Sequence, residues 1–100
     1  MQYIESMSFY RWNILKNEWL KKERGIFFEE VVWHIEHGDL LDDIIHPNQK
    51  KYPDQRIMVV RVKEYACIVP YVENEEGVFL KTVIPNRKAT RDYIRKGQKQ

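Results

Sequence analysis

Three strand-like segments separated by very short connections constrain the fold of this chain most strongly. Residues 56–63 (RIMVVRVK), 65–73 and 77–84 are rich in β-branched and aromatic side chains, which favour strands. Parallel neighbours need a long crossover connection, and the chain has none between these segments. The segments should therefore form an antiparallel meander.

Two details of the meander follow from individual residues. Lys63-Glu64 forms a possible tight turn between the first two strands. Pro70 has no N–H to give to a neighbouring strand, so it should lie on an edge strand or at a bulge. In the last strand, alternation should place four side chains on one face: Val78, Leu80, Thr82 and Ile84.

A short strand and a helix are expected before the meander. After a strand over residues 8–12, a helix should run over residues 13–24, with Asn13 as its N-cap. Gly25 suits the left-handed conformation that follows a helix end. Three apolar residues at spacings of three and four should share one face of this helix: Trp12, Leu15 and Trp19.

A second helix is expected over residues 28–37, ended by Gly38. Its apolar residues fit the i, i+3, i+4, i+7 pattern of an amphipathic helix: Phe28, Val31, Val32 and Ile35. His34 and His37 share a face of this helix, but no further ligand lies nearby in the sequence, so we interpret them as surface residues and expect no metal site.

The remaining segments complete a single α+β domain over residues 1–100. Residues 40–46 predict a strand, residues 46–55 a polar loop, and residues 86–96 a final helix. Residues 1–8 and 97–100 are expected to be poorly ordered. The predicted order is a short strand, two helices, a meander and a helix.

Composition limits the function without defining it. The net charge is +2, which permits RNA binding but does not require it. The single Cys67 cannot form an internal disulfide, and neither a signal peptide nor a membrane-spanning apolar run is apparent. We therefore expect a cytoplasmic protein that uses no cofactor and no membrane.

Four blocks in a fixed order carry a family resemblance. They are YRWNILK (residues 10–16), KERGIFFEE (residues 22–30), a strand that starts at Arg56, and IPNRKAT (residues 84–90). Together they resemble the BrnT-type ribonuclease toxins of bacterial toxin–antitoxin pairs. The chain departs from the family pattern at Asn13, where the family has Asp, and at Arg24, where it has His before Gly.

The resemblance implies a RelE-like α+β fold and a metal-independent endoribonuclease that inhibits growth by cutting RNA. It also implies a ribbon-helix-helix antitoxin as the partner, with DNA contacted only through that antitoxin. Because Arg24 cannot serve as a base at neutral pH, a second hypothesis is an inactive member that acts as an antitoxin-binding module or corepressor. A third is an unrelated RNA- or protein-binding domain.

Arg87 and Lys88 are the first candidates for RNA phosphate contact. Asn86 should cap the helix that they begin, and N–H groups at a helix start favour an anion; Arg can also fork onto phosphate oxygens. The alternative is that both residues are solvated or contact acidic side chains of an antitoxin. Lys22 and Arg24 are the other candidates for phosphate contact, in a basic groove between sheet and helices.

Catalytic roles are predicted for Arg56, Arg87, Lys16 and His46. Arg56 and Lys16 match family positions, although either can be an ordinary surface charge. His46 precedes a polar loop that contains Tyr52, a setting suited to proton transfer. Arg56 and Arg61 are five residues apart on one strand and should point to opposite faces.

The tryptophans are interpreted mainly as core residues rather than as platforms for base stacking. Trp33 lies beside the apolar stripe of its helix, so it could be half exposed and contact an antitoxin. The adjacent acidic pairs, Glu29-Glu30 and Asp42-Asp43, are interpreted as solvated charge, because neighbouring side chains diverge on a helix or strand.

Overall fold

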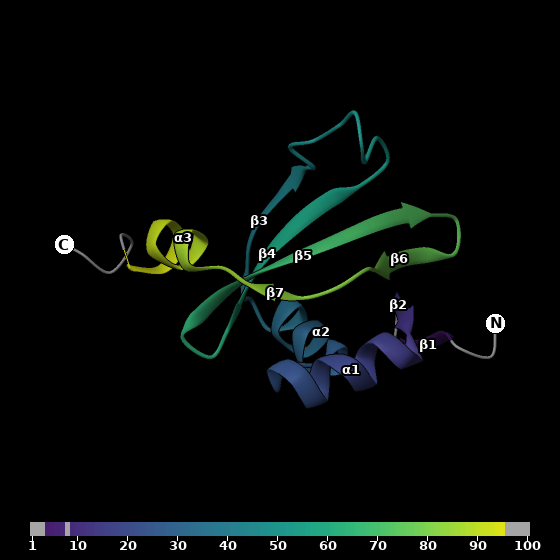
Figure 1. Cartoon of the computed structure of the whole chain (residues 1–100), viewed down its shortest axis with the longest axis horizontal. Coiled ribbons are helices and arrows are strands. Elements are labelled where there is room, and N and C mark those ends of the chain that lie inside the picture. The colour runs from purple at the N-terminus through teal and green to yellow at the C-terminus, as the bar shows by residue number, and fades with distance from the viewer. Residues whose placement is uncertain (1–3, 8, 96–100) are drawn as a thin grey trace.

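The structure, a computed structural model, describes residues 4–7 and 9–95 and shows an α+β domain built on a mixed sheet (Figure 1). The strands follow the spatial order β1-β2-β6-β5-β4-β3, with β7 paired to β5. The elements are β1 (Ile4–Met7), β2 (Tyr10–Asn13), α1 (Ile14–Arg24), α2 (Phe28–Glu36), β3 (Leu40–Ile45), β4 (Arg56–Val62), β5 (Tyr65–Asn74), β6 (Gly77–Leu80), β7 (Ile84–Pro85), α3 (Arg87–Ala89) and a π-helical segment (Thr90–Arg95).

The antiparallel meander is confirmed. Strands β3, β4, β5 and β6 each pair antiparallel with the next. The tight turn between β4 and β5 is also confirmed, with Lys63 in the left-handed region at φ 60°. The sheet is nevertheless mixed, because β2 joins β6 in parallel. Gly77 permits this pairing: it has φ 120°, and a Cβ there would lie 2.4 Å from the Phe9 carbonyl oxygen.

The expected continuous strand over residues 77–84 is wrong. Strand β6 ends at Leu80, and the chain resumes pairing with β5 only at β7. Pro70 explains the interruption: its carbonyl accepts the Lys81 N–H at 2.8 Å, but its nitrogen, on the same side of β5, has no proton to give. Pro70 therefore lies in a central strand, not an edge, opposite a break in its neighbour. The expected alternation stops there, with Val83 buried and Ile84 39% exposed.

Helix α1 begins and ends as predicted. The Asn13 side chain accepts the Lys16 N–H at 3.0 Å, and Gly25 adopts φ 65°. The predicted shared face is wrong, and its expected members differ in burial: Trp12 is 1% exposed, Leu15 62% and Trp19 42%. Trp12 belongs to β2, so helical spacing does not relate it to the other two. The residues that α1 does bury are Asn17 and Leu20.

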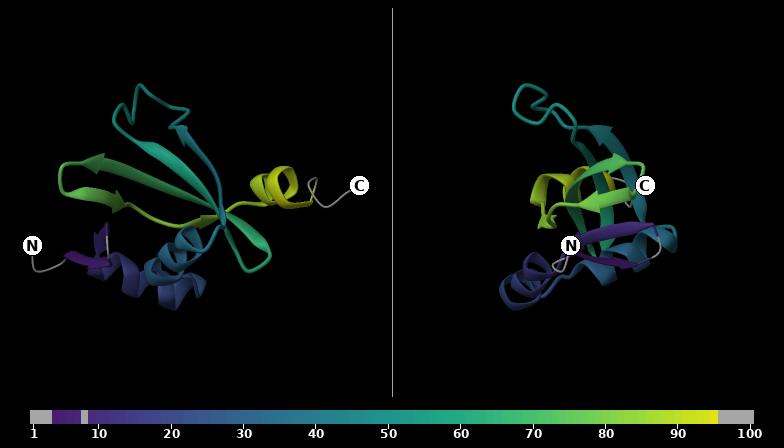
Figure 2. Two further views of the ribbon diagram at one scale, coloured as in Figure 1. Left: turned by 180° about the vertical axis from the view of Figure 1, so that it is seen from behind. Right: turned by 90° about the vertical axis from the view of Figure 1, so that its right-hand side faces the viewer.

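Helix α2 buries the predicted stripe. Phe28, Val31 and Val32 are fully buried, and Ile35 packs against the same core. This core lies between the two helices and one face of the sheet; a second cluster lies on the opposite face under the C-terminal helix. Figure 2 shows α1 and α2 below the sheet, with the C-terminal helix separate from them.

The chain ends differ in part from expectation. Ile4–Met7 form β1, which pairs antiparallel with β2. Residues 1–3, 8 and 96–100, which include the rest of the segments expected to be poorly ordered, lie outside the described residues. The final helix has the predicted Asn86 cap, whose side chain accepts the Ala89 N–H at 2.7 Å, but it continues as a π-helix. Within the described residues, no helix is long and apolar enough to cross a membrane.

Candidate functional site

The start of β4 carries the first group of candidate residues. Arg56 Nε lies 3.1 Å from the Tyr71 hydroxyl and 3.3 Å from Asp43 Oδ1, and the Tyr71 hydroxyl donates to the same carboxylate at 2.7 Å. Burial, together with this hydrogen bond to Asp43, raises the pKa of Tyr71 to about 12. Arg56 is therefore already paired, and Tyr71 stays protonated at neutral pH.

His46 lies at the same end of the sheet as Arg56. It directly follows Ile45, which pairs with Arg56 across β3 and β4. Its Nδ1 accepts the Asn48 N–H at 3.0 Å, and its ring centroid is 4.5 Å from that of Tyr52. The structure thus places Arg56 and His46 at the same end of the sheet, with the imidazole held by its own loop.

Arg87 and Lys88 lie at the opposite end of the sheet. The Asn86 N–H, just before them, donates to the Ala66 carbonyl beside the β4–β5 turn. Ala66 and Tyr71, the partner of Arg56, are five residues apart on β5, or about 16 Å at the usual strand rise. Arg87 and Arg56 therefore do not share a site. Lys88 is exposed and pairs with Asp92 at 3.0 Å.

Arg24 connects helix α1 to the segment that leads to Arg87. Its Nη1 donates to the Val83 carbonyl at 2.7 Å. Four residues of extended chain span at most about 14 Å, so the Val83 carbonyl that Arg24 contacts lies within that distance of Arg87 along the chain. Lys16 lies eight residues before Arg24, or about 12 Å along the helix axis. Lys22 is exposed on the same helix.

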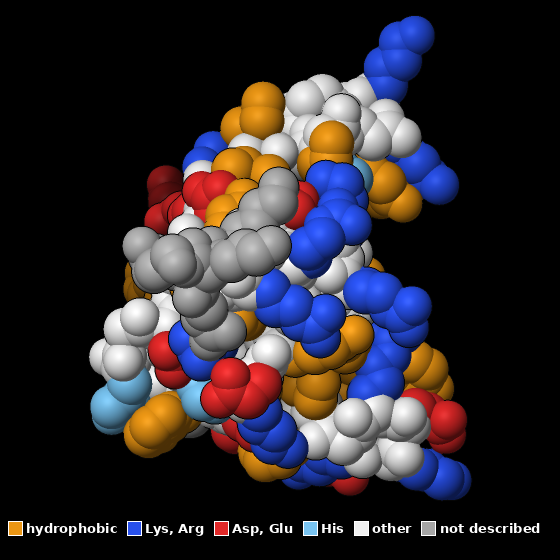
Figure 3. Space-filling view, turned by 90° about the vertical axis from the view of Figure 1, so that its left-hand side faces the viewer, with side chains coloured by type: hydrophobic (Ala, Val, Ile, Leu, Met, Phe, Trp, Pro, Cys, Tyr) orange, Lys and Arg blue, Asp and Glu red, His pale blue; other side chains and the backbone are white. Residues whose placement is uncertain are grey.

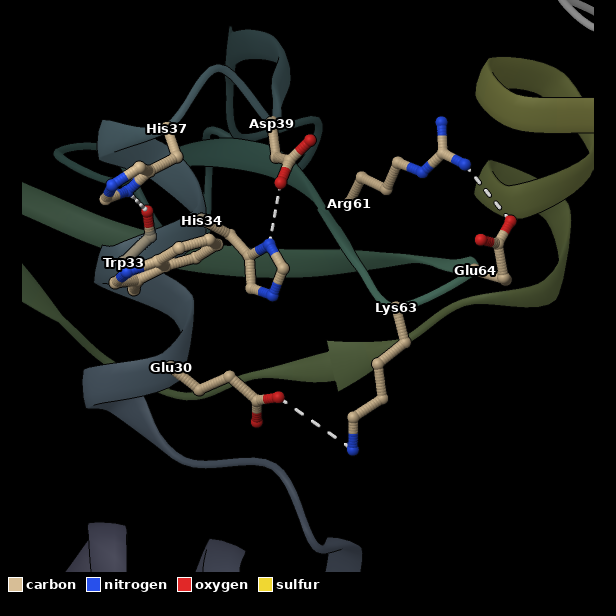
Figure 4. Close-up of polar contacts among 8 residues, drawn as sticks. All are labelled: Glu30, Trp33, His34, His37, Asp39, Arg61, Lys63 and Glu64. Carbon is tan, nitrogen blue, oxygen red and sulfur yellow. Dashed lines mark hydrogen bonds and ion pairs between the residues drawn. The ribbon is translucent and has the colours of Figure 1, made fainter.

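A cluster that the sequence did not suggest lies between α2 and the β4–β5 turn (Figure 4). His34 Nδ1 is 2.7 Å from Asp39 Oδ2, and their side chains are 18% and 31% exposed. Glu30, one helical turn before His34, pairs with Lys63 at 3.8 Å. Figure 4 shows the second nitrogen of the His34 ring turned away from Asp39, on the side of Glu30 and Lys63.

The acidic side chains of this cluster differ in how completely they are hydrogen-bonded. Glu30 Oε1 is buried without a hydrogen-bond partner among the described residues. Asp39, by contrast, is anchored by its backbone: its carbonyl accepts the Arg61 N–H at 2.9 Å. An Asp that accepts from Nδ1–H fixes the imidazole tautomer and leaves Nε2 with the lone pair that a base needs. We name His34, Asp39, Glu30 and Lys63 the dyad cluster.

A sequence signal for the His34–Asp39 pair was present. Gly38 has φ 91° just after α2, and the Asp39 N–H donates to the His34 carbonyl at 2.9 Å. This is the bond from the second residue beyond a helix back to its last turn that a left-handed glycine produces. A His four residues before such a Gly, with an Asp directly after it, therefore indicates the contact.

The interpretation of the acidic pairs as solvated charge holds for Asp43, which is exposed, and is incomplete for the other three carboxylates, which are partly buried. Each of the four carboxylates has a side-chain partner, and the two of each pair have different ones: Asn17 for Glu29, Lys63 for Glu30, Tyr93 for Asp42 and Tyr71 for Asp43. The prediction that the two side chains of each pair diverge is confirmed, and this divergence brings them to separate partners. The prediction that Arg56 and Arg61 point to opposite faces is confirmed, since Arg56 joins the Tyr71 side while Arg61 pairs with Glu64.

Two of the three tryptophans are exposed. Trp33 is 51% exposed, as expected for a half-exposed residue, and stacks on His37 with centroids 3.9 Å apart. Its role in antitoxin binding stays a prediction. Trp12 is the buried one and stacks on Phe28.

Basic side chains gather on one face of the molecule. Figure 3 shows Lys and Arg in a band from the β3–β4 loop at the top to the helical layer at the bottom. Exposed cations of these elements and of the C-terminal helix include Lys22, Lys51, Arg87 and Arg91. Among residues 4–7 and 9–95, no group of three or more His, Cys, Asp or Glu could hold a metal ion.

Comparisons with protein-family models, curated proteins and solved structures found no match to this chain.

Proposed function

We propose that this chain binds and cleaves RNA without a metal, as a toxin of the BrnT type with a RelE-like fold, acting in the cytoplasm and neutralised by a ribbon-helix-helix antitoxin. One observation carries the catalytic part: the 2.7 Å contact that orients His34 on Asp39, beside Lys63 and at the end of the sheet where Arg87 lies. Arg87 and Lys88 keep their proposed phosphate role, whereas His34 takes the role of base.

The reaction is an internal transfer at phosphorus. His34 Nε2 takes the proton of a ribose 2′-hydroxyl, and the 2′-oxygen attacks the adjacent phosphorus. The bond to the 5′-oxygen breaks, and that oxygen takes a proton from the Lys63 ammonium or from water. The products are a 2′,3′-cyclic phosphate and a 5′-hydroxyl. Lys63 supplies positive charge for the phosphorane, which is where electrostatic stabilisation acts, and Arg87 contacts another phosphate of the bound strand.

The test is incubation of the purified chain with RNA in EDTA. His34→Gln should lower the cleavage rate by about 100-fold or more, the usual contribution of a general base. His37→Gln is the matched control, because it changes an exposed histidine of the same helix. Intact RNA with the unchanged chain would refute the enzymatic proposal, and full activity of His34→Gln with loss in His46→Gln would move the base to the Arg56 end.

An inactive antitoxin-binding module is the second candidate. Arg24, which stands where the family has His, is bound to the Val83 carbonyl, and Arg56 is paired with Asp43 and Tyr71. Both cations are therefore engaged within the chain. This candidate predicts tight antitoxin binding and no RNA cleavage by either the unchanged chain or His34→Gln.

A further inference from the structure

Trp19 is an exposed aromatic ring with two cations close to it. The side chain is 42% exposed on α1. Lys16 Nζ lies 4.3 Å and Arg24 Cζ 4.9 Å from the centre of its ring. The neighbouring Leu15, one turn earlier, is 62% exposed, so the surface around the ring is uncovered.

The two cations differ in how firmly they are held. Arg24 is fixed by its 2.7 Å bond from Nη1 to the Val83 carbonyl, which leaves its other N–H groups for an anion. Lys16 has a flexible stem and, among the described residues, its ammonium contacts the ring alone, so it can leave the ring for a phosphate. Helix α1 carries four Lys or Arg and two Glu, one of which, Glu18, is 3.7 Å from Lys21. The excess charge is positive.

An unpaired nucleotide matches this chemistry. A base can stack on an indole ring, and its flanking phosphates can take the two cations. Bases inside a duplex are already stacked, so a double-stranded RNA cannot use the ring. An acidic peptide matches the cations but offers no comparable flat surface to the indole.

We propose that Trp19 is a base-stacking platform for single-stranded RNA, with Arg24 and Lys16 contacting the phosphates on either side. The inference rests on the proposed function and specifies its substrate class. Arg24 also contacts the Val83 carbonyl, four residues before Arg87 in the chain. The alternative is that Trp19 and the two cations form surface cation–π contacts whose only role is to stabilise the helix.

The experiment measures binding of a fluorescent single-stranded 2′-O-methyl RNA, which cannot be cleaved. Trp19→Ala should weaken binding about 10-fold, within the range for one stacked base, while Trp19→Phe should keep most of the affinity. Phe9→Ala is the matched control, because Phe9 is as exposed but lies just before β2, outside α1. Arg24→Gln should weaken binding and lower the salt slope by about one, whereas Trp19→Ala should leave the slope unchanged.

The outcomes separate the two proposals. If the unchanged chain binds no RNA, the proposed function and this inference both fail. If it binds RNA and Trp19→Ala binds equally well, or duplex RNA binds as tightly as the single strand, only the platform fails. Equal weakening by Trp19→Ala of binding to poly-glutamate would assign the site to an acidic protein instead. Trp19→Phe keeps the test valid if Trp19→Ala unfolds.

Discussion

Asn17 is the residue on which the placement of α2 most depends. It is 1% exposed on α1, and its Oδ1 accepts the buried Phe28 N–H at 2.8 Å. Its Nδ2 donates to Glu29 Oε1, also at 2.8 Å. Phe27, the residue at the cap position of α2, makes no side-chain cap bond. Asn17 therefore caps α2 from a different helix.

Asn17→Ala should destabilise the chain by about 3 kcal/mol. The buried Phe28 N–H would lose its partner, at a cost of about 1–3 kcal/mol, and the bond to Glu29 would remove about 1 kcal/mol more. For a domain of this size, that loss lowers the midpoint of thermal unfolding by about 15 °C. Because α2 carries His34 and Glu30, any RNA cleavage should be lost at a correspondingly lower temperature.

The assay is thermal and urea unfolding followed by circular dichroism, with Asn13→Ala as the control. Asn13 also caps a helix, but its bond to the Lys16 N–H is only partly buried, so its loss should cost about 1 kcal/mol. If Asn17→Ala costs no more than Asn13→Ala, water reaches the Phe28 N–H and the reasoning from burial is wrong.

Two further predictions concern the sheet. Gly77→Ala should cost on the order of 3 kcal/mol, because the new Cβ would meet the Phe9 carbonyl oxygen at 2.4 Å with φ 120°; a urea midpoint equal to that of the unchanged chain would contradict it. Tyr71 has a pKa of about 12 in the folded chain against 10.0 ordinarily. Its protonated hydroxyl therefore stabilises the folded state fully below pH 10.0, and this stabilisation is lost as the pH rises toward about 12. Tyr71→Phe should therefore reduce the fall in the free energy of unfolding over that pH range by up to about 2 kcal/mol, as measured by urea unfolding, and an unchanged pH dependence would exclude this cause.

Much of the secondary structure was determined by local sequence. The Asn13 and Asn86 caps, the Gly25 stop and the stripe on α2 depend on side chains within a few residues of one another, so spacing alone predicts them. The same holds for the hairpins of the meander. Interruption of the last strand was not predictable in this way, because it depends on which residue lies opposite Pro70 in the sheet.

The candidate site was predicted residue by residue but not as an arrangement. Arg24 reaches the Val83 carbonyl, four residues before Arg87, whereas Arg56 and His46 lie at the other end of the sheet. The register of β4 and β5 sets that separation, and register depends on pairing between distant segments. The choice among His34, His37 and His46 likewise required the position of Asp39.

The sequence by itself determined the α+β class, the helix caps and the basic character of the last helix, because each depends on local composition or spacing. Only the tertiary structure decided that β2 joins β6 in parallel, that Asn17 caps the second helix, and that Trp19 lies exposed beside Arg24. These features depend on contacts between residues far apart in the chain. Side-chain chemistry permits many such contacts, and packing around the core selects one set.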